Sequence, residues 1–122
     1  KHPSAFSVNE SGIPDVPERV HWDTEFARRV GVPEAYDYGP QRVSWLCQVV
    51  TNWMGDDGFI REFWGEVRRH NLNGDTTWLK GTVSEKRKEG AHALVDLELW
   101  GYDQRGERTI LGSATVVLPA RD

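Results

Sequence analysis

The chain has 122 residues, enough for one hydrophobic core and too few for two. Apolar residues make up 38% of it and charged residues 28%, which is typical of a folded domain and excludes a disordered chain. The net charge of -4 gives no basic footprint for nucleic acid or anionic lipid, and no apolar run is long enough to span a membrane. The single cysteine, Cys47, excludes an internal disulfide and fits a reducing compartment. We therefore expect a soluble cytoplasmic domain without nucleic-acid or membrane partners.

The first 18 residues have the composition of irregular backbone. Pro3, Gly12, Pro14 and Pro17 interrupt them, with Ser and Asn in between. Only residues 5–8 suggest a short strand. We therefore expect an irregular segment ahead of the first helix.

A short surface helix is predicted over residues 25–30, after Asp23 and Thr24. Asp23 is a residue type that caps helices, Glu25 is an acid in the first turn, and Gly31 is a stop signal. We therefore interpret Asp23 as an N-cap rather than as a catalytic group.

A longer helix is predicted from Gly39-Pro40 to Met54. Proline is favoured at the first helical position, and apolar residues recur afterwards at helical spacing. The apolar stripe consists of Val43, Leu46, Cys47, Val50 and Met54, widened by Trp45, Val49 and Trp53. Because so little of the helix is polar, we expect other structure to wrap most of it.

After Phe59 the pattern changes to strands and turns. Residues 92–101 and 108–118 alternate between apolar and polar, and the turn at Asp103-Gln104-Arg105-Gly106 makes them a hairpin. Two more strands are expected at 59–69 and 76–85, with connections at 71–75 and 86–90. We expect a meander whose apolar face is covered by the long helix, the only cover that the sequence offers.

Several short motifs follow one another along the chain. They are Val20-His21-Trp22-Asp23, Phe26-Ala27, Gly31, Gly39 at the helix start, Thr51-Asn52-Trp53-Met54-Gly55-Asp56, Arg68-Arg69-His70-Asn71-Leu72-Asn73-Gly74-Asp75-Thr76 and Asp103-Gln104-Arg105-Gly106-Glu107. In this order and spacing they resemble the MaoC-like acyl dehydratases and (R)-specific enoyl-CoA hydratases, over residues 18–119.

The resemblance implies a fold, a ligand and an assembly. The fold is the α+β hot dog, a curved antiparallel sheet wrapped around one long central helix, with residues 1–122 forming a single domain. The ligand is an acyl thioester, usually acyl-CoA, whose enoyl group is hydrated or whose hydroxyl is eliminated without a cofactor. The assembly is a homodimer or a hetero-oligomer with another hot-dog subunit.

Such chemistry sets its own requirements. Adding water to a 2-enoyl thioester puts negative charge on the thioester oxygen, so the site needs donors aimed at that oxygen and a base for the water. The N-terminus of the long helix offers free backbone N–H groups. Pro40 has none, so the candidate donors are Gly39, Gln41 and Arg42. Gly39 matches the glycine with this role in the resembling family; alternatively, it merely permits a tight turn.

His21 is the candidate base. Imidazole exchanges protons near neutral pH, and the resembling family has a catalytic histidine in this motif. The family's acid, five residues earlier, is replaced here by Val16. Asp15 and then Glu18 are the nearest candidates to take its place. The alternative is that His21 is a hydrogen-bonded remnant in a hot dog that does not catalyse.

The segment before Gly39 also departs from the family, because Tyr38 stands where many members have a histidine. Asp37 is a third candidate acid if it faces the cavity. We favour an orientation toward solvent, where Asp37 interacts only with the helix dipole. Tyr36 and Tyr38 are candidates to line an acyl pocket, with ordinary packing as the alternative.

No metal site or reactive thiol is predicted. His2, His70 and His92 are scattered, and no Cys or His stands at ligand spacing. Cys47 lies on the apolar stripe of the long helix, where a thiol is usually inert.

The leading hypothesis is an enoyl-CoA hydratase or acyl dehydratase that uses His21 and Gly39. Its rival is a non-catalytic acyl-thioester binder, or the structural partner subunit of a two-hot-dog hydratase, which Val16 favours. A thioesterase ranks last, because it needs a carboxylate on the long helix and residues 40–54 contain none.

Overall fold

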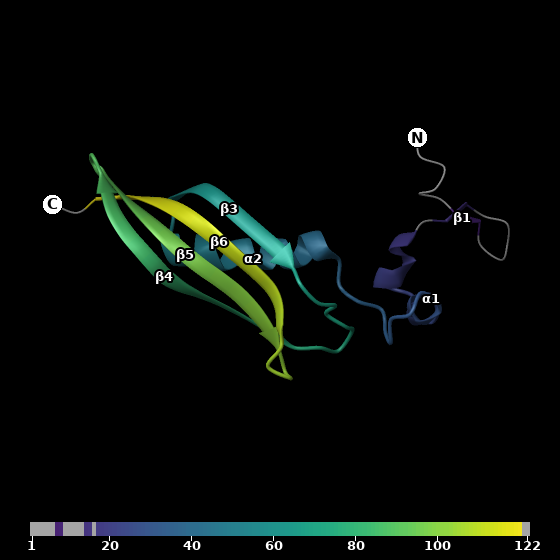
Figure 1. The fold of residues 1–122 in the computed structure, drawn as a ribbon. Helices are drawn as coiled ribbons and strands as arrows, with labels where there is room; N and C mark the ends of the chain where they lie inside the picture. Colours follow the sequence, from purple (N-terminus) through teal and green to yellow (C-terminus); the bar gives the residue numbers. More distant parts are fainter. Residues whose placement is uncertain (1–6, 9–13, 16, 121–122) are drawn as a thin grey trace.

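A curved antiparallel sheet and one long helix form the main body of the chain (Figure 1). This computed structural model describes residues 7–8, 14–15 and 17–120, and the side chains from Arg19 to Ala120. The long helix, α2 (Gly39–Met54), lies across one face of the sheet. The predicted architecture of one sheet covered by one central helix is therefore confirmed.

Both ends of α2 lie where the sequence predicts them. Pro40 occupies the first turn, where its missing N–H costs no hydrogen bond. Gly55 ends the helix with a φ of 73°, a left-handed conformation that favours glycine. The helix is less enclosed than expected, because Trp53 on its outward face is 49% exposed in the single chain. Within the described residues, no helix is long and apolar enough to cross a membrane.

All four predicted strands are present. They are β3 (Phe59–Val67), β4 (Thr77–Glu89), β5 (His92–Asp103) and β6 (Arg108–Pro119). Most boundaries differ by one or two residues, and the largest difference is at the end of β4, which continues through the charged segment that the sequence suggested was a connection. Only Gly90 and Ala91 separate β4 from β5. Each residue of β4 from Lys86 to Glu89 pairs with β5, and this pairing outweighs the low strand propensity of Lys and Glu.

The order of the strands corrects the expected meander. The sheet runs β3-β6-β5-β4, so β3 pairs with β6 and not with β4. Only β4, β5 and β6 form a meander. Residues 68–76 carry the chain from one edge of the sheet to the other. This crossover brings the end of β3 next to the start of α2, where the candidate site lies.

The core lies between α2 and the sheet. Its buried members are Leu46, Val50, Val95, Leu97, Leu99, Ile110, Ala114 and Val116. The alternation predicted for β5 and β6 correctly assigns their helix-facing residues. Gly112 lets β6 lie close to both β3 and α2. A Cβ at this position would lie 2.5 Å from the Trp64 carbonyl oxygen and 2.7 Å from Leu46 Cδ2.

Among its described residues, the N-terminal part has four short elements. They are β1 (Ser7–Val8), β2 (Pro14–Asp15), the 3-10 helix η2 (Pro17–His21) and α1 (Thr24–Arg29). Part of the strand suggested at 5–8 lies outside the described residues. The irregular segment ends earlier than expected, since Pro17 begins η2 and the fixed φ of proline suits a helical first turn. The Asp23 side chain accepts a hydrogen bond from Phe26 N at 3.1 Å, which confirms the predicted N-cap.

Candidate active site

His21 lies at the end of η2 and contacts the segment that leads into α2. Its Nδ1 lies 3.0 Å from the backbone oxygen of Tyr36. A carbonyl oxygen only accepts hydrogen bonds, so Nδ1 carries the proton and Nε2 keeps its lone pair. The half-buried ring is therefore held in the tautomer that a general base requires.

The Tyr36 ring lies in contact with two histidines. The His21 ring meets it edge-on at a centroid distance of 4.8 Å, and the His70 ring contacts it at 4.5 Å. Tyr38 also approaches His21, at 5.2 Å. Sequence analysis treated His70 as one of several scattered histidines. No local pattern could reveal its position, because residues 36 and 70 meet only through the fold.

Backbone hydrogen bonds tie the two segments together. Tyr36 and Leu72 form an antiparallel bridge. The Asp37 N–H donates to the Asn71 oxygen at 2.9 Å, and Asn73 N–H donates to the Ala35 oxygen at 2.8 Å. The positions of Tyr36 and His70 are therefore fixed by main-chain pairing.

Gly39 begins α2 beside this cluster. Its N–H has no acceptor among the described residues, as expected of a donor at a helix N-terminus. The predicted Gln41 donor is corrected, because Gln41 N–H already donates to the Tyr38 oxygen at 2.9 Å; Arg42 N–H points to the same oxygen at 3.3 Å. Of the predicted donors, only Gly39 lacks an acceptor within the described part of the chain.

The chain itself does not require a glycine at position 39. A Cβ there would meet only Val67 Cγ2, at an ordinary 3.6 Å. Nor does Gly39 have a positive φ. Neither space nor backbone conformation therefore supports the alternative that Gly39 is needed only for a tight turn.

Asp37 does not face solvent, which corrects the favoured expectation. Its side chain is 12% exposed and forms an ion pair with Arg42, which is 1% exposed. Arg42 Nε donates to Asp37 Oδ2 at 2.8 Å, and Arg42 Nη2 donates to Oδ1. The negative charge of Asp37 beside Gly39 is thus neutralised. A carboxylate held in this way cannot act as a free base.

Arg42 also joins the helix to β6 and to the segment that follows β3. Its Nη1 donates to the backbone oxygens of Arg69, at 2.6 Å, and Thr109, at 3.0 Å. Sequence analysis considered Arg42 only for its backbone N–H. A signal was available, since a cation in the first turn of a helix opposes the helix dipole and needs a partner.

A cavity of about 310 Å³ opens at this junction. Its lining residues are Tyr36, Asp37, Gly39, Arg42, Val67, Arg68, Arg69 and His70. The size falls at the lower end of the range for small-molecule sites. The side chains of the two predicted acids, Asp15 and Glu18, lie outside the described residues. Among the described side chains, none with a carboxylate bonds to His21.

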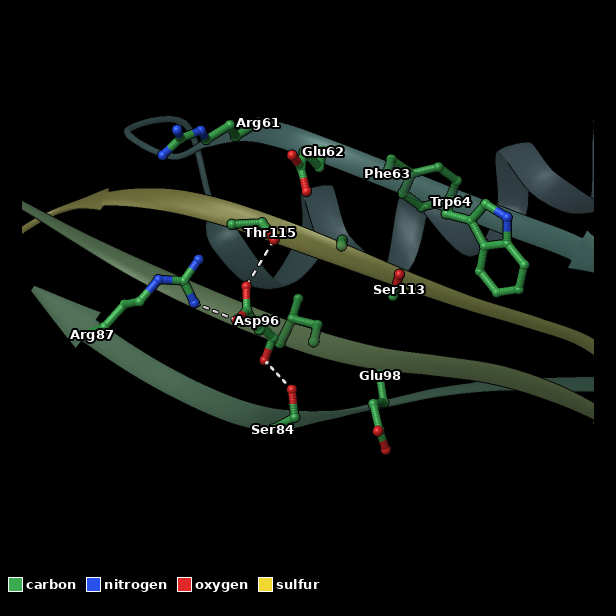
Figure 2. Close-up of a pocket in the computed structure, with 12 residues that line it drawn as sticks. Arg61, Glu62, Phe63, Trp64, Ser84, Arg87, Asp96, Glu98, Ser113 and Thr115 are labelled. Atoms are coloured by element: carbon green, nitrogen blue, oxygen red, sulfur yellow. Dashed lines mark hydrogen bonds and ion pairs between the residues drawn. The ribbon is translucent and has the colours of Figure 1, made fainter. Parts of the chain in front are cut away.

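A second hollow, of about 830 Å³, lies on the sheet face opposite α2 (Figure 2). Asp96 lies at its centre, where it accepts a hydrogen bond from Thr115 at 2.7 Å and pairs with Arg87. The hydrogen bonds from Thr115 and Arg87 lower the pKa of Asp96, so it stays ionised. This hollow has no helix N-terminus, and its central carboxylate is already paired.

The described residues contain no group of three or more His, Cys, Asp and Glu side chains that could hold a metal ion. Cys47 is a free, half-buried thiol on α2.

Comparison with known proteins identifies the fold. No family model and no curated protein sequence matches the chain. The (R)-hydratase from A. caviae involved in PHA biosynthesis superposes with a TM-score of 0.74 at 19% identity, over 83% of this chain and 76% of its own. A MaoC-like dehydratase from Rhodospirillum rubrum gives 0.74 at 19% identity, over 87% and 77%. The ChsH1-ChsH2 complex from Mycobacterium tuberculosis gives 0.72 at 18%, over 82% and 75%.

The chain therefore has an α+β hot-dog fold. More particularly, its fold is that of the MaoC-like dehydratases and (R)-hydratases, so the resemblance found in the sequence motifs is confirmed at the level of the fold.

Proposed function

We propose that this protein is an acyl-thioester hydratase or dehydratase of the MaoC-like type, with an enoyl-CoA as its substrate. The observation that carries the proposal is the free N–H of Gly39, at the N-terminus of α2 and on the wall of the 310 Å³ cavity. A helix N-terminus stabilises the negative charge that develops on a thioester oxygen. The Asp37–Arg42 pair favours this role, because it removes the nearest negative charge.

His21 is the proposed base. Its Nδ1 proton is engaged by the Tyr36 oxygen, so Nε2 is the atom that accepts a proton from water. The same hydrogen bond fixes the plane of the ring. In the reverse direction, protonated His21 assists the departure of the 3-hydroxyl group as water.

The acid partner of His21 is proposed from the acids that the sequence nominates. Asp37 is committed to Arg42, which leaves Asp15 ahead of Glu18 among the acids that the sequence nominated. Asp15 belongs to β2 and Glu18 to η2, only a few residues before His21.

A non-catalytic role is the second candidate. Val16 stands at the place of the resembling family's acid, and one similar structure is a complex, ChsH1-ChsH2. In that case the chain binds an acyl thioester, or supports a second hot-dog subunit that carries the catalytic residues.

We also propose that residues 1–122 act as one domain, in the cytoplasm.

Hydration of crotonyl-CoA by the purified protein tests the proposal. We expect turnover by the wild type and a loss of about a hundredfold or more in His21→Ala, the usual effect of removing a general base. Far-ultraviolet circular dichroism checks that the variant is folded. His92→Ala, which changes an exposed histidine at the start of β5, is the matched control and should retain full activity. An inactive wild type that still binds crotonyl-CoA would favour the non-catalytic role.

Substituting Gly39 tests the site of the thioester oxygen. Gly39→Ala should fold normally, because its Cβ meets only Val67 at 3.6 Å. The added methyl group displaces a ligand that approaches the N–H, and a misplacement of about 1 Å costs about a hundredfold in kcat/KM. Steady-state kinetics measure the loss. Unchanged kinetics in this variant would remove Gly39 from the site.

A further inference from the structure

Hydration requires a proton to leave water and another to reach the acyl Cα. The proposed function assigns the first transfer to Nε2 of His21, whose ring contacts Tyr36 of the cavity wall. Three of the cavity-lining side chains, those of Arg42, Arg68 and Arg69, are guanidinium groups, which do not give up a proton in proteins. Asp37, also on the wall, is held by Arg42. The wall therefore offers few groups for the second transfer.

Two titratable side chains of the cavity wall remain, Tyr36 and His70. A tyrosine hydroxyl ordinarily loses its proton only near pH 10, whereas imidazole exchanges protons near neutral pH. His70 shares the cavity with Gly39 and contacts the Tyr36 ring at 4.5 Å, and His21 contacts the same ring at 4.8 Å. The distance between the centroids of the His21 and His70 rings therefore cannot exceed the sum of these two distances.

The backbone around His70 is fixed on both sides. Before it, the Arg69 oxygen accepts a hydrogen bond from buried Arg42 at 2.6 Å. After it, the Asn71 oxygen accepts one from Asp37 N–H at 2.9 Å, and the Asn71 side chain donates to the Asp37 carboxylate at 3.3 Å. The segment that carries His70 is thus attached to the start of α2, which also carries Gly39. This arrangement keeps an exposed imidazole at a constant place on the cavity wall.

We propose that His70 is the second acid–base residue of this site, in place of the carboxylate that Val16 removes. The inference rests on the proposed hydratase function and extends it from one histidine to two.

The proton balance closes with two histidines. His21 Nε2 takes a proton from water while the water oxygen forms a bond to Cβ of the enoyl group. The electrons of the double bond move toward the thioester, whose oxygen becomes negative beside the Gly39 N–H. Protonated His70 gives its proton to Cα, and the thioester carbonyl re-forms. Solvent then carries the proton from His21 to His70, so both side chains return to their starting states.

The test is crotonyl-CoA hydration by the full chain with His70→Gln and His70→Ala. Glutamine keeps a polar side chain but cannot transfer a proton, so we expect kcat to fall about a hundredfold in both variants with KM little changed. Added imidazole should restore part of the activity of His70→Ala. His92→Gln is the matched control, since it makes the same change at an exposed histidine at the start of β5. Thermal unfolding of each variant verifies the fold.

The outcomes separate this inference from the proposed function. An active wild type whose rate survives His70→Gln overturns the role of His70 and leaves the hydratase proposal standing. A loss of activity that follows a loss of thermal stability, without rescue by imidazole, assigns His70 a structural role and also overturns the inference. A wild type without hydratase activity overturns both.

Discussion

Arg42 lies where a helix tolerates a cation least, in the first turn of α2 at the positive end of the helix dipole. Complete burial adds a desolvation penalty. The fold compensates with the Asp37 carboxylate and two backbone oxygens, those of Arg69 and Thr109. One side chain therefore connects the start of α2 with the segment after β3 and the start of β6, and it assembles the candidate site.

Removing Arg42 should destabilise the chain strongly. In Arg42→Met the Asp37 carboxylate stays buried without its partner, and two backbone oxygens lose their donor, so we expect a loss of about 3–5 kcal/mol in the free energy of unfolding. Urea denaturation measures it. The control is Arg61→Met, which breaks an exposed ion pair with Glu89 at 3.6 Å and should change stability by less than about 1 kcal/mol. Equal effects of the two substitutions would contradict this account of Arg42.

Asp75 makes stability depend on pH. Burial alone raises the pKa of its carboxyl, but hydrogen bonds from Gln104, Arg105 and the Leu72 N–H outweigh burial and hold the pKa below its ordinary value. The unfolded chain has an Asp pKa near 3.9, so the ionised carboxylate stabilises the fold fully above about pH 4. This stabilisation is lost as the pH falls through the lower pKa of the folded state.

We therefore expect Asp75→Asn to lower the free energy of unfolding at pH 7 by about 1.5–3 kcal/mol, the usual range for hydrogen bonds to a charged group. Urea denaturation at a series of pH values should show the gap to the wild type narrowing below about pH 4. Asp57→Asn, in the exposed turn after α2, serves as the control and should change little. If the difference in the free energy of unfolding between the wild type and Asp75→Asn stays constant down to pH 2, the effect comes from packing rather than charge.

Residue-level prediction from the sequence worked where the partners are close along the chain. Asp23 caps α1 through a residue three positions away, and the local pattern predicts this contact. Arg42 bonds to residues 27 and 67 positions away, and no local pattern specifies such partners. The same limit explains why His70 was missed. Asp37 was oriented wrongly for another reason, since its partner Arg42 is close along the chain but was considered only for its backbone N–H.

At the scale of elements, the alternation of apolar and polar residues identified the two faces of each strand. It could not predict which strands pair. The alternation in β5 and β6 correctly placed Leu97 and Ala114 toward the helix. Pairing depends on which strand completes the cover of α2, and this is a property of the whole sheet. The sequence therefore predicted four strands and two helices, while the β3–β6 pairing became evident only in the structure.

The contact between α2 and the sheet depends on Gly112. A Cβ at this position would lie 2.5 Å from the Trp64 oxygen and 2.7 Å from Leu46 Cδ2. Because backbone cannot yield as a flexible side chain does, Gly112→Ala should cost about 1–3 kcal/mol through overpacking. Denaturant unfolding of this variant beside Gly39→Ala tests the claim, because the same added methyl meets no close neighbour at position 39. A Gly112→Ala variant of wild-type stability would show that α2 can shift away from the sheet.

At the scale of the whole molecule, the two edges of the sheet differ in character. Along the β4 edge every residue from Lys80 to Glu89 is exposed, and most are charged, which discourages pairing with another sheet. The β3 edge instead exposes Phe59, Trp64 and Val67, and Trp53 of α2 is exposed as well. Exposed apolar groups of this size mark a surface that another protein covers.

We predict that the chain forms a dimer through the β3 side. Light scattering at micromolar concentration should give twice the chain mass for the wild type, and Phe59→Lys should shift the population to monomer. Phe59 is 67% exposed in the single chain, so the substitution removes little of the core and acts on association. Val83→Lys is the matched control, because Val83 is an exposed apolar residue on the opposite edge and its substitution should leave the dimer intact. A wild type that stays monomeric at micromolar concentration contradicts self-association. The exposed β3 side would then be assigned to binding a different hot-dog subunit.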